Sequence, residues 1–288
     1  MKSPRGRSIS AMLLAVVLTA SAAPALAGAG DPFYERSLMV AANARCGLFS
    51  PAIASALDAS ALQARGAALR AGVAETALKA SKSRAEAKAR GLACASPDLA
   101  QAATRVRTAF EGYAKIWKMN FPGAAASWAA DRARPTDLAP AARWALSQTA
   151  SGGMVLGVVL HRQGQALTAV IPGAADASSA RLIMRDPVLA PAPYLDPKAP
   201  GLQGRTPPRS VTRAWLASER GPAPAGLAKA GGQAFRFPDT AIEALQALDP
   251  REAVVLELVY SSRTGEQTRQ TLFEVGDFAA AQAFLDAR

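Results

Sequence analysis

A Ser or Asp stands directly before a Pro three times between residues 28 and 123, and this arrangement constrains the fold most strongly. The pairs are Asp31-Pro32, Ser50-Pro51 and Ser96-Pro97. A short polar residue followed by Pro is typical of the first turn of a helix. Glycines such as Gly72 and Gly91 end the alanine-rich segments that follow, as glycines commonly do after helices. The pattern predicts four helices, at about 31–48, 51–71, 74–90 and 97–120.

The chain has two cysteines, and they lie at matching ends of these predicted helices. Cys46 falls near the end of the first helix, and Cys94 lies just before the start of the fourth. Short turns make consecutive helices antiparallel, so both cysteines arrive at the same end of a four-helix bundle. We therefore predict a disulfide between them. Closing a loop of about 48 residues stabilises a fold by roughly 4 kcal/mol in the chain-entropy description.

The apolar pattern changes after about residue 145. Two pairs of β-branched runs flank short polar turns and predict hairpins, at 153–161 with 166–171 and at 252–261 with 268–275. Further strands are expected at 180–185 and 211–216, and short helices at 239–248 and 277–287. Segment 187–210 holds seven prolines, which exclude a regular helix or a central strand.

These observations predict an α+β protein in which a disulfide-stapled four-helix bundle precedes an antiparallel, sandwich-like β domain with short helices. The expected divisions are a signal peptide at 1–27, the bundle at 28–122, a linker with a short helix at 123–145, and the β domain at 146–288. The Pro-rich segment 187–210 is expected to be a long loop of the β domain.

The first 27 residues have the three parts of a secretory signal peptide. Lys2, Arg5 and Arg7 form a basic head, residues 11–20 are apolar, and Ala25-Leu26-Ala27 matches a signal-peptidase site. We expect cleavage after Ala27 and a periplasmic or secreted, soluble chain without a transmembrane span. An oxidising compartment is also where a disulfide persists.

The net charge of +11 is concentrated in the helical half. Segment 79–90 holds five basic residues and one acidic residue on a single predicted helix, and these five form a candidate anion-docking strip. The basic residues are Lys79, Lys82, Arg84, Lys88 and Arg90. Outside the cytoplasm such a strip faces anionic lipid or acidic envelope polymer rather than nucleic acid. A solvated basic surface that serves solubility is the alternative.

No motif in the chain predicts catalysis, a cofactor or a metal ion. The single histidine, His161, stands at a hairpin end beside Arg162, and two cysteines with one distant histidine are too few for a structural zinc site. Neither a G-x-S-x-G elbow nor an S-x-x-K motif is present. A pair of distant catalytic carboxylates would leave no local signature, so a hydrolase stays open.

The C-terminal part resembles the invasion-associated protein B family of exported bacterial β-rich proteins. The resemblance covers about the last 140 residues and consists of strand, hairpin and strand, followed by Gly276-Asp277-Phe278-Ala279-Ala280-Ala281 and a short helix. It implies a non-enzymatic role in the cell envelope and no catalytic residues.

The sequence therefore favours a non-enzymatic periplasmic protein that acts in binding or envelope maintenance through surface contacts. Its partner would be an anionic envelope lipid or polymer, or another envelope protein. Two alternatives remain, an exported hydrolase of cell-wall material and a subunit of a larger envelope assembly. A cleft with two close carboxylates would favour the hydrolase.

Overall fold

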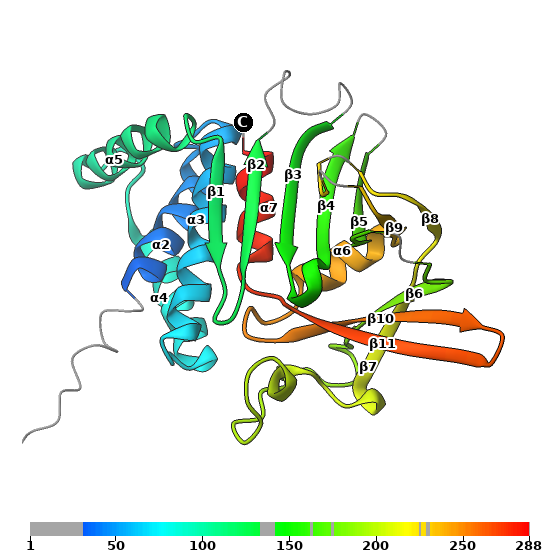
Figure 1. Ribbon diagram of the computed structural model, residues 1–288. Coiled ribbons are helices and arrows are strands. Elements are labelled where there is room, and N and C mark those ends of the chain that lie inside the picture. Colours follow the sequence, from blue (N-terminus) through cyan, green and yellow to red (C-terminus); the bar gives the residue numbers. More distant parts are fainter. Residues whose placement is uncertain are drawn as a thin grey trace, which may run out of the picture.

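The computed structural model describes residues 31–132, 142–161, 164–173, 176–224, 226–228 and 231–287 (Figure 1). The predicted signal peptide and its cleavage site lie outside these residues, as does most of the second half of the predicted linker. Within them the chain is mixed α+β, as the sequence predicts, with four helices followed by antiparallel sheets and short helices.

The four N-terminal helices begin at or close to the predicted positions. They are α2 (Asp31–Cys46), α3 (Pro51–Arg70), α4 (Glu75–Gly91) and α5 (Pro97–Tyr113). Pro51 and Pro97 occupy the first turns of α3 and α5, where a missing N–H costs nothing. The fourth helix is shorter than predicted, because residues 118–122 form a strand, and Trp117 therefore does not continue its apolar stripe.

Two antiparallel sheets make up the rest of the fold. The larger has the strand order β1-β2-β3-β4-β5-β9-β8, and the smaller has the order β11-β10-β6-β7. In the larger sheet the strands are β1 (Lys118–Pro122), β2 (Ser127–Arg132), β3 (Ala142–Thr149), β4 (Val155–His161), β5 (Gly164–Ile171), β8 (Glu219–Pro222) and β9 (Gln233–Arg236). In the smaller they are β6 (Ser179–Arg185), β7 (Thr212–Leu216), β10 (Ala253–Ser262) and β11 (Gly265–Glu274).

Both predicted hairpins are confirmed, as β4–β5 and β10–β11. The helices α6 (Asp239–Gln246) and α7 (Phe278–Asp286) also form where they are expected, and they pack against the larger sheet (Figure 1). Side chains from both sheets, α6 and α7 share one hydrophobic core, which includes Leu156, Phe273 and Phe284. The short 3₁₀ helices are η1 (Ser151–Gly153), η2 (Gln203–Arg205) and η3 (Arg209–Val211).

The predicted linker with a short helix at 123–145 is wrong where the structure describes it. Residues 127–132 form β2, whose side chains alternate between the core and the outside. Trp128 is fully buried and stacks edge-on against Phe278 of α7, with ring centroids 4.8 Å apart. The sheet already begins at Lys118, before the expected end of the bundle at residue 122, so its first strands pack on the C-terminal helix.

The helical and β-rich parts are joined by a close contact between α3 and α7. Arg70 donates two hydrogen bonds, of 2.7 and 2.8 Å, to the carboxylate of Asp277 at the start of α7. Gly66 lies one turn earlier on α3, and a Cβ at this position would overlap Oδ1 of Asp277. The absence of a side chain at residue 66 therefore lets the two helices approach.

Candidate functional site

The five basic residues of the predicted strip all lie on α4 with exposed side chains, but they form two separate rows. Lys79, Lys82 and Arg90 line a groove in the helical half, whereas Arg84 and Lys88 do not. Helical spacing explains the division, because the two rows lie on opposite sides of the buried stripe of α4. That stripe consists of Leu78, Ser81, Ala85 and Ala89. We call Lys79, Lys82 and Arg90 the inner row, and Arg84 and Lys88 the outer row.

The groove has a volume of about 810 Å³ and is bounded by α2, α3 and α4. From α2 it is lined by Phe33, Ser37, Val40, Ala41, Ala44 and Arg45. From α3 it is lined by Asp58, Ala61, Leu62 and Arg65, and from α4 by Glu75, Leu78, Lys79, Lys82, Glu86, Ala89 and Arg90. The lining thus combines an apolar interior with charged side chains from the flanking helices.

The groove exists because α3 and α4 both pack against α2, whereas their backbones approach each other closely at few positions. The side chains that face the space between them are small, among them Ala41, Ala44 and Ala61. The side chain of Leu62 remains 40% exposed, although most leucine side chains are buried in a folded protein. The alanine-rich composition that favours helix formation therefore also leaves this space unfilled.

Most of the acidic side chains of the groove are already paired. Glu75 accepts a hydrogen bond of 2.8 Å from Arg65, and Glu86 lies 4.0 Å from Lys82. Lys79 and Arg90 have no ion-pair or hydrogen-bond partner among the residues that the structure describes. Burial in the groove wall raises the pKa of Asp58 above its ordinary value, because the charged form is partly desolvated.

The predicted disulfide is confirmed and closes one end of the helical half. Cys46 and Cys94 are bonded, with Cα atoms 5.6 Å apart. Beside the disulfide, Arg45 donates hydrogen bonds to the carbonyl oxygens of Ala89, at 2.7 Å, and of Leu92. These carbonyls belong to the end of α4, where a cation is also favoured by the helix dipole. The disulfide and Arg45 together hold α4 against α2, which keeps the groove wall in place.

Three glutamates that were not singled out from the sequence are fully buried. Glu257 and Glu274 lie in strands of the smaller sheet, and Glu252 directly precedes its strand β10. Each of them pairs with one or two arginines, so none is a free carboxylate. The pairs are Arg185–Glu252, Arg181–Glu257, Arg209–Glu257 and Arg205–Glu274. Glu257 has a lowered pKa: burial opposes the shift, but hydrogen bonds from Gln270 and Arg181 and the charges of two arginines outweigh it. This arrangement neutralises charge and is unlike the catalytic pair of a glycosidase, in which one carboxyl group is a general acid and the other a base or nucleophile.

These pairs fix the Pro-rich segment 187–210, which contains only turns and short 3₁₀ helices, as the sequence predicts. Arg205 and Arg209, at its C-terminal end, reach Glu274 and Glu257. Tyr194 donates its backbone N–H to Glu252 at 3.2 Å. The segment is therefore an anchored loop that lies against the smaller sheet.

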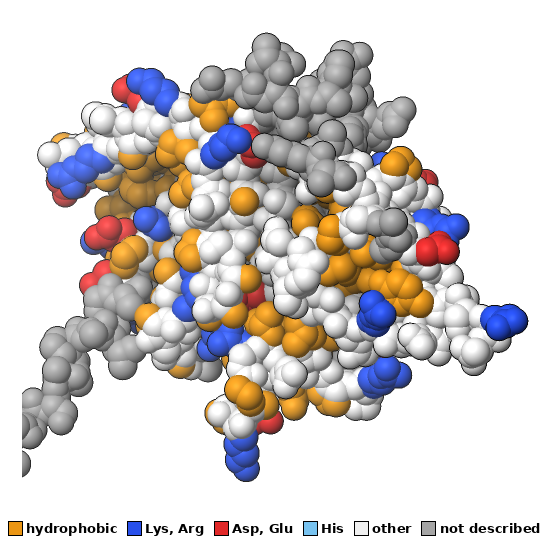
Figure 2. Space-filling view, viewed as in Figure 1, with side chains coloured by type: hydrophobic (Ala, Val, Ile, Leu, Met, Phe, Trp, Pro, Cys, Tyr) orange, Lys and Arg blue, Asp and Glu red, His pale blue; other side chains and the backbone are white. Residues whose placement is uncertain are grey.

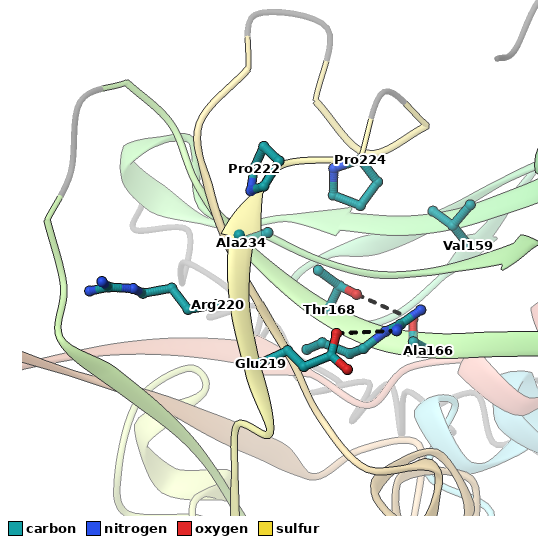
Figure 3. Close-up of a pocket in the computed structure, with 10 residues that line it drawn as sticks. Val159, Ala166, Thr168, Glu219, Arg220, Pro222, Pro224 and Ala234 are labelled. Carbon is teal, nitrogen blue, oxygen red and sulfur yellow. Dashed lines mark hydrogen bonds and ion pairs between the residues drawn. The ribbon is translucent and has the colours of Figure 1, made fainter.

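A second, smaller cavity of about 210 Å³ lies beside β5, β8 and β9 (Figure 3). Glu219 accepts a hydrogen bond of 3.3 Å from Arg236, and the Thr168 hydroxyl donates to the carbonyl of Ala166 at 3.4 Å. Arg220 extends away from these groups and donates to the carbonyl of Ala177. The polar side chains that line this cavity are thus already paired, and they form no nucleophile–base pair of the kind that hydrolases use.

The remaining candidates are a metal site, His161 and a strongly charged surface. Among the described residues, no three His, Cys, Asp or Glu side chains are grouped so that they could hold a metal ion. The side chain of His161 lies outside the described part of the chain. On the face shown in Figure 2, blue and red side chains are interspersed rather than gathered into one strongly charged surface.

The chain matches no family model, no curated protein and no solved structure. The resemblance of its C-terminal part to the invasion-associated protein B family therefore stays a prediction. Within the described ranges, no helix is both long enough and apolar enough to cross a membrane.

The groove was missed at the sequence level, although three of its charged lining residues, Lys79, Lys82 and Arg90, belong to the predicted strip. The 3.6-residue period separates the inner row from the outer row, and both rows could be derived from spacing alone. The gap between α3 and α4 could not be derived from spacing, because it depends on how these two helices pack on α2. For two of the glutamates a signal did exist: Glu257 interrupts an apolar strand run, Glu252 directly precedes it, and buried acids require partners.

Proposed function

We propose that this protein is an exported, non-enzymatic binding protein that contacts anionic envelope material through α4. The observation that carries the proposal is the set of exposed cations on both sides of the buried stripe of α4. Arg84 and Lys88 have no partner within the described residues, so their charges are available to an external anion. The disulfide supports an oxidising compartment, and the signal-like first 27 residues support export.

The chemistry of the rest of the molecule is consistent with binding rather than turnover. The buried carboxylates of the described chain that lie near the smaller sheet are paired with arginines, and the polar groups of the smaller cavity are paired with one another. Phosphate groups of lipids and lipopolysaccharide, and acidic polymers, are the anions that α4 would meet outside the cytoplasm. Each basic side chain near an anionic bilayer contributes about 1 kcal/mol of attraction.

Co-sedimentation with vesicles tests this proposal. Vesicles of phosphatidylcholine with phosphatidylglycerol are mixed with the protein and with the variant R84E/K88E. We expect the variant to bind at least about tenfold more weakly, since each reversal removes an attraction of about 1 kcal/mol and adds a repulsion. We expect wild-type binding to weaken at high salt, because exposed charges are screened.

The matched control is R105E/K115E, which changes the net charge equally at exposed positions on α5 and in the turn that follows it. It should keep most of the binding. Equal losses in the two variants would mean that net charge, and not α4, governs the interaction. Unchanged sedimentation of R84E/K88E would refute the proposal.

A further inference from the structure

We propose that the groove between α3 and α4 holds one acyl chain of a single-chain lipid, whose anionic headgroup meets the inner row of α4. This inference rests on the proposed function and deepens it, because it names the class of envelope molecule that the protein takes up. The outer row would then attract the anionic surface, and the groove would receive a molecule from it.

The shape and lining of the groove favour an acyl chain. A volume of about 810 Å³ falls within the range of roughly 300–1,000 Å³ that is typical of small-molecule sites. Its interior is formed by Val40, Ala41, Ala61, Leu62 and Leu78. Leu62 is 40% exposed in the structure, so an apolar ligand would cover surface that is now in contact with water.

The polarity of the interior separates an acyl chain from a peptide. Every residue of a peptide brings a backbone N–H and C=O that must be hydrogen-bonded when they are buried. Apart from Ser37, the α2 side of the groove is apolar until Arg45 at its end. A methylene chain needs no hydrogen-bond partners, and its burial removes apolar surface from water, which is favourable.

The charges place the headgroup on the α4 side. Lys79 and Arg90 line the groove without a partner in the described chain, and Lys82 lies between them in a loose pair with Glu86. On the opposite wall, Asp58 carries a carboxylate, which repels a second negative charge when it is ionised. An anionic headgroup is therefore favoured at α4 and disfavoured at α3.

Binding of a dansyl-labelled undecanoic acid, followed by its fluorescence, measures occupation of the groove directly. We expect saturable binding to the purified protein and displacement by laurate. A61W places a large side chain inside the groove and should weaken binding by at least about tenfold. A67W introduces the same side chain at an exposed α3 position that does not line the groove, and should bind as the wild type does.

A second pair of variants tests the headgroup. The wild type should bind laurate more tightly than its uncharged methyl ester, and K79Q/R90Q should reduce this preference while still binding the ester. R84Q/K88Q should keep the preference, since the outer row does not line the groove. Unchanged vesicle binding of R84E/K88E, together with saturable laurate binding by the wild type, would refute only the proposed surface role. Weakened vesicle binding of R84E/K88E, together with no laurate binding by the wild type, would refute only the groove.

Three results would overturn the inference. Equal weakening in A61W and A67W would show that the effect is not local to the groove. Equal affinity for laurate and its methyl ester would remove the role of the inner row. Sedimentation velocity that shows a wild-type dimer and a monomeric A61W would assign the groove to a second copy of the chain.

Discussion

Glu274 illustrates at the scale of a single residue how a buried charge organises this fold. Its carboxylate accepts hydrogen bonds from the backbone N–H groups of Ala124, Ala125 and Ala126, at 2.7 to 2.8 Å, and one of 3.1 Å from Arg205. The side chain is fully buried. It thereby connects the β1–β2 turn, β11 and the anchored Pro-rich loop.

Replacing Glu274 by Gln should lower the free energy of unfolding by about 3 kcal/mol, because Arg205 and one or more backbone donors lose their charged partner. Glu266→Gln is the matched control, since Glu266 is exposed on the same strand, and it should change stability by less than about 0.5 kcal/mol. Urea unfolding measures both variants. Equal stabilities of the two would contradict the role given to Glu274.

Tyr113 provides a prediction about pH. Burial raises its pKa to about 12, although the charge of Arg132 acts in the opposite direction. A raised pKa means that the folded state holds the phenolic proton more tightly, so this contribution to stability is complete below pH 10 and is lost as the pH rises toward 12. The difference between the tyrosinate titrations of wild type and Tyr113→Phe should have its midpoint near 12.

The same variant should be as stable as the wild type at neutral pH, or more stable by about 1 kcal/mol. The Tyr113 hydroxyl is buried without a hydrogen-bond partner in the described chain, and phenylalanine removes this cost while keeping the edge-on contact with Phe284. A clear loss of stability in urea would show that the hydroxyl has a partner.

The arginine–glutamate pairs also show why residue-scale detail escaped the sequence. Arg185 and Glu252 are 67 positions apart, and Arg205 and Glu274 are 69 apart. No local pattern joins such residues, and the pairing depends on where the Pro-rich loop lies. What the sequence could show was that acids inside an apolar strand needed partners of some kind.

At the scale of elements, the contact between α3 and α7 depends on a missing side chain. Gly66→Ala should destabilise the protein by about 1–3 kcal/mol, because the new methyl group would overlap the carboxylate of Asp277 that Arg70 holds. Gly91→Ala, at the end of α4, meets nothing within 4 Å and should be neutral or stabilising by up to about 1 kcal/mol. Thermal unfolding distinguishes them, and similar melting temperatures would contradict this packing.

The disulfide should be the main covalent support of the helices. Replacing Cys46 and Cys94 by Ser should lower the free energy of unfolding by up to about 4 kcal/mol, since a closed loop of 48 residues is released. Cys94 is exposed, so a mild reductant should produce the same loss in the wild type and no change in the double variant. Circular dichroism in urea measures both, and an unaffected wild type would contradict the prediction.

Elements with local signals were predicted well, and elements that depend on tertiary contacts were not. The Pro-led starts of α3 and α5 and the β10–β11 hairpin follow from capping and turn chemistry. β2 was missed because Ala129 and Ala130 are poor strand formers. It is stabilised by Trp128, which packs on α7 and donates to the carbonyl of Val275 at 2.8 Å.

The groove also depends on tertiary contacts that no local sequence pattern shows. The alanines of α2 and α3 predicted helices that approach closely, and α2 does pack against both α3 and α4. Nothing in the local pattern shows that α3 and α4 remain apart. Charge spacing on the predicted helix identified the five basic residues of α4, so the site's cations were accessible from sequence while its cavity was not.

At the scale of the whole molecule, the main core and the proposed binding surfaces lie in different parts. The β-rich part and α7 form one continuous core with paired buried charges, whereas the helical half has small cores, exposed cations and the groove. Arg70 and Asp277 tie the two parts together. In this arrangement the β-rich part supports the helical half, which carries the proposed binding surfaces.

Native mass spectrometry of the protein isolated from the envelope of its own host can show whether it is an exported, lipid-binding protein. We predict a chain that begins at residue 28, with two hydrogens fewer than the reduced form and with a fraction carrying one noncovalently bound single-chain anionic lipid. The lipid-bound fraction should disappear in A61W. An uncleaved chain with two free thiols and no bound lipid would contradict the account.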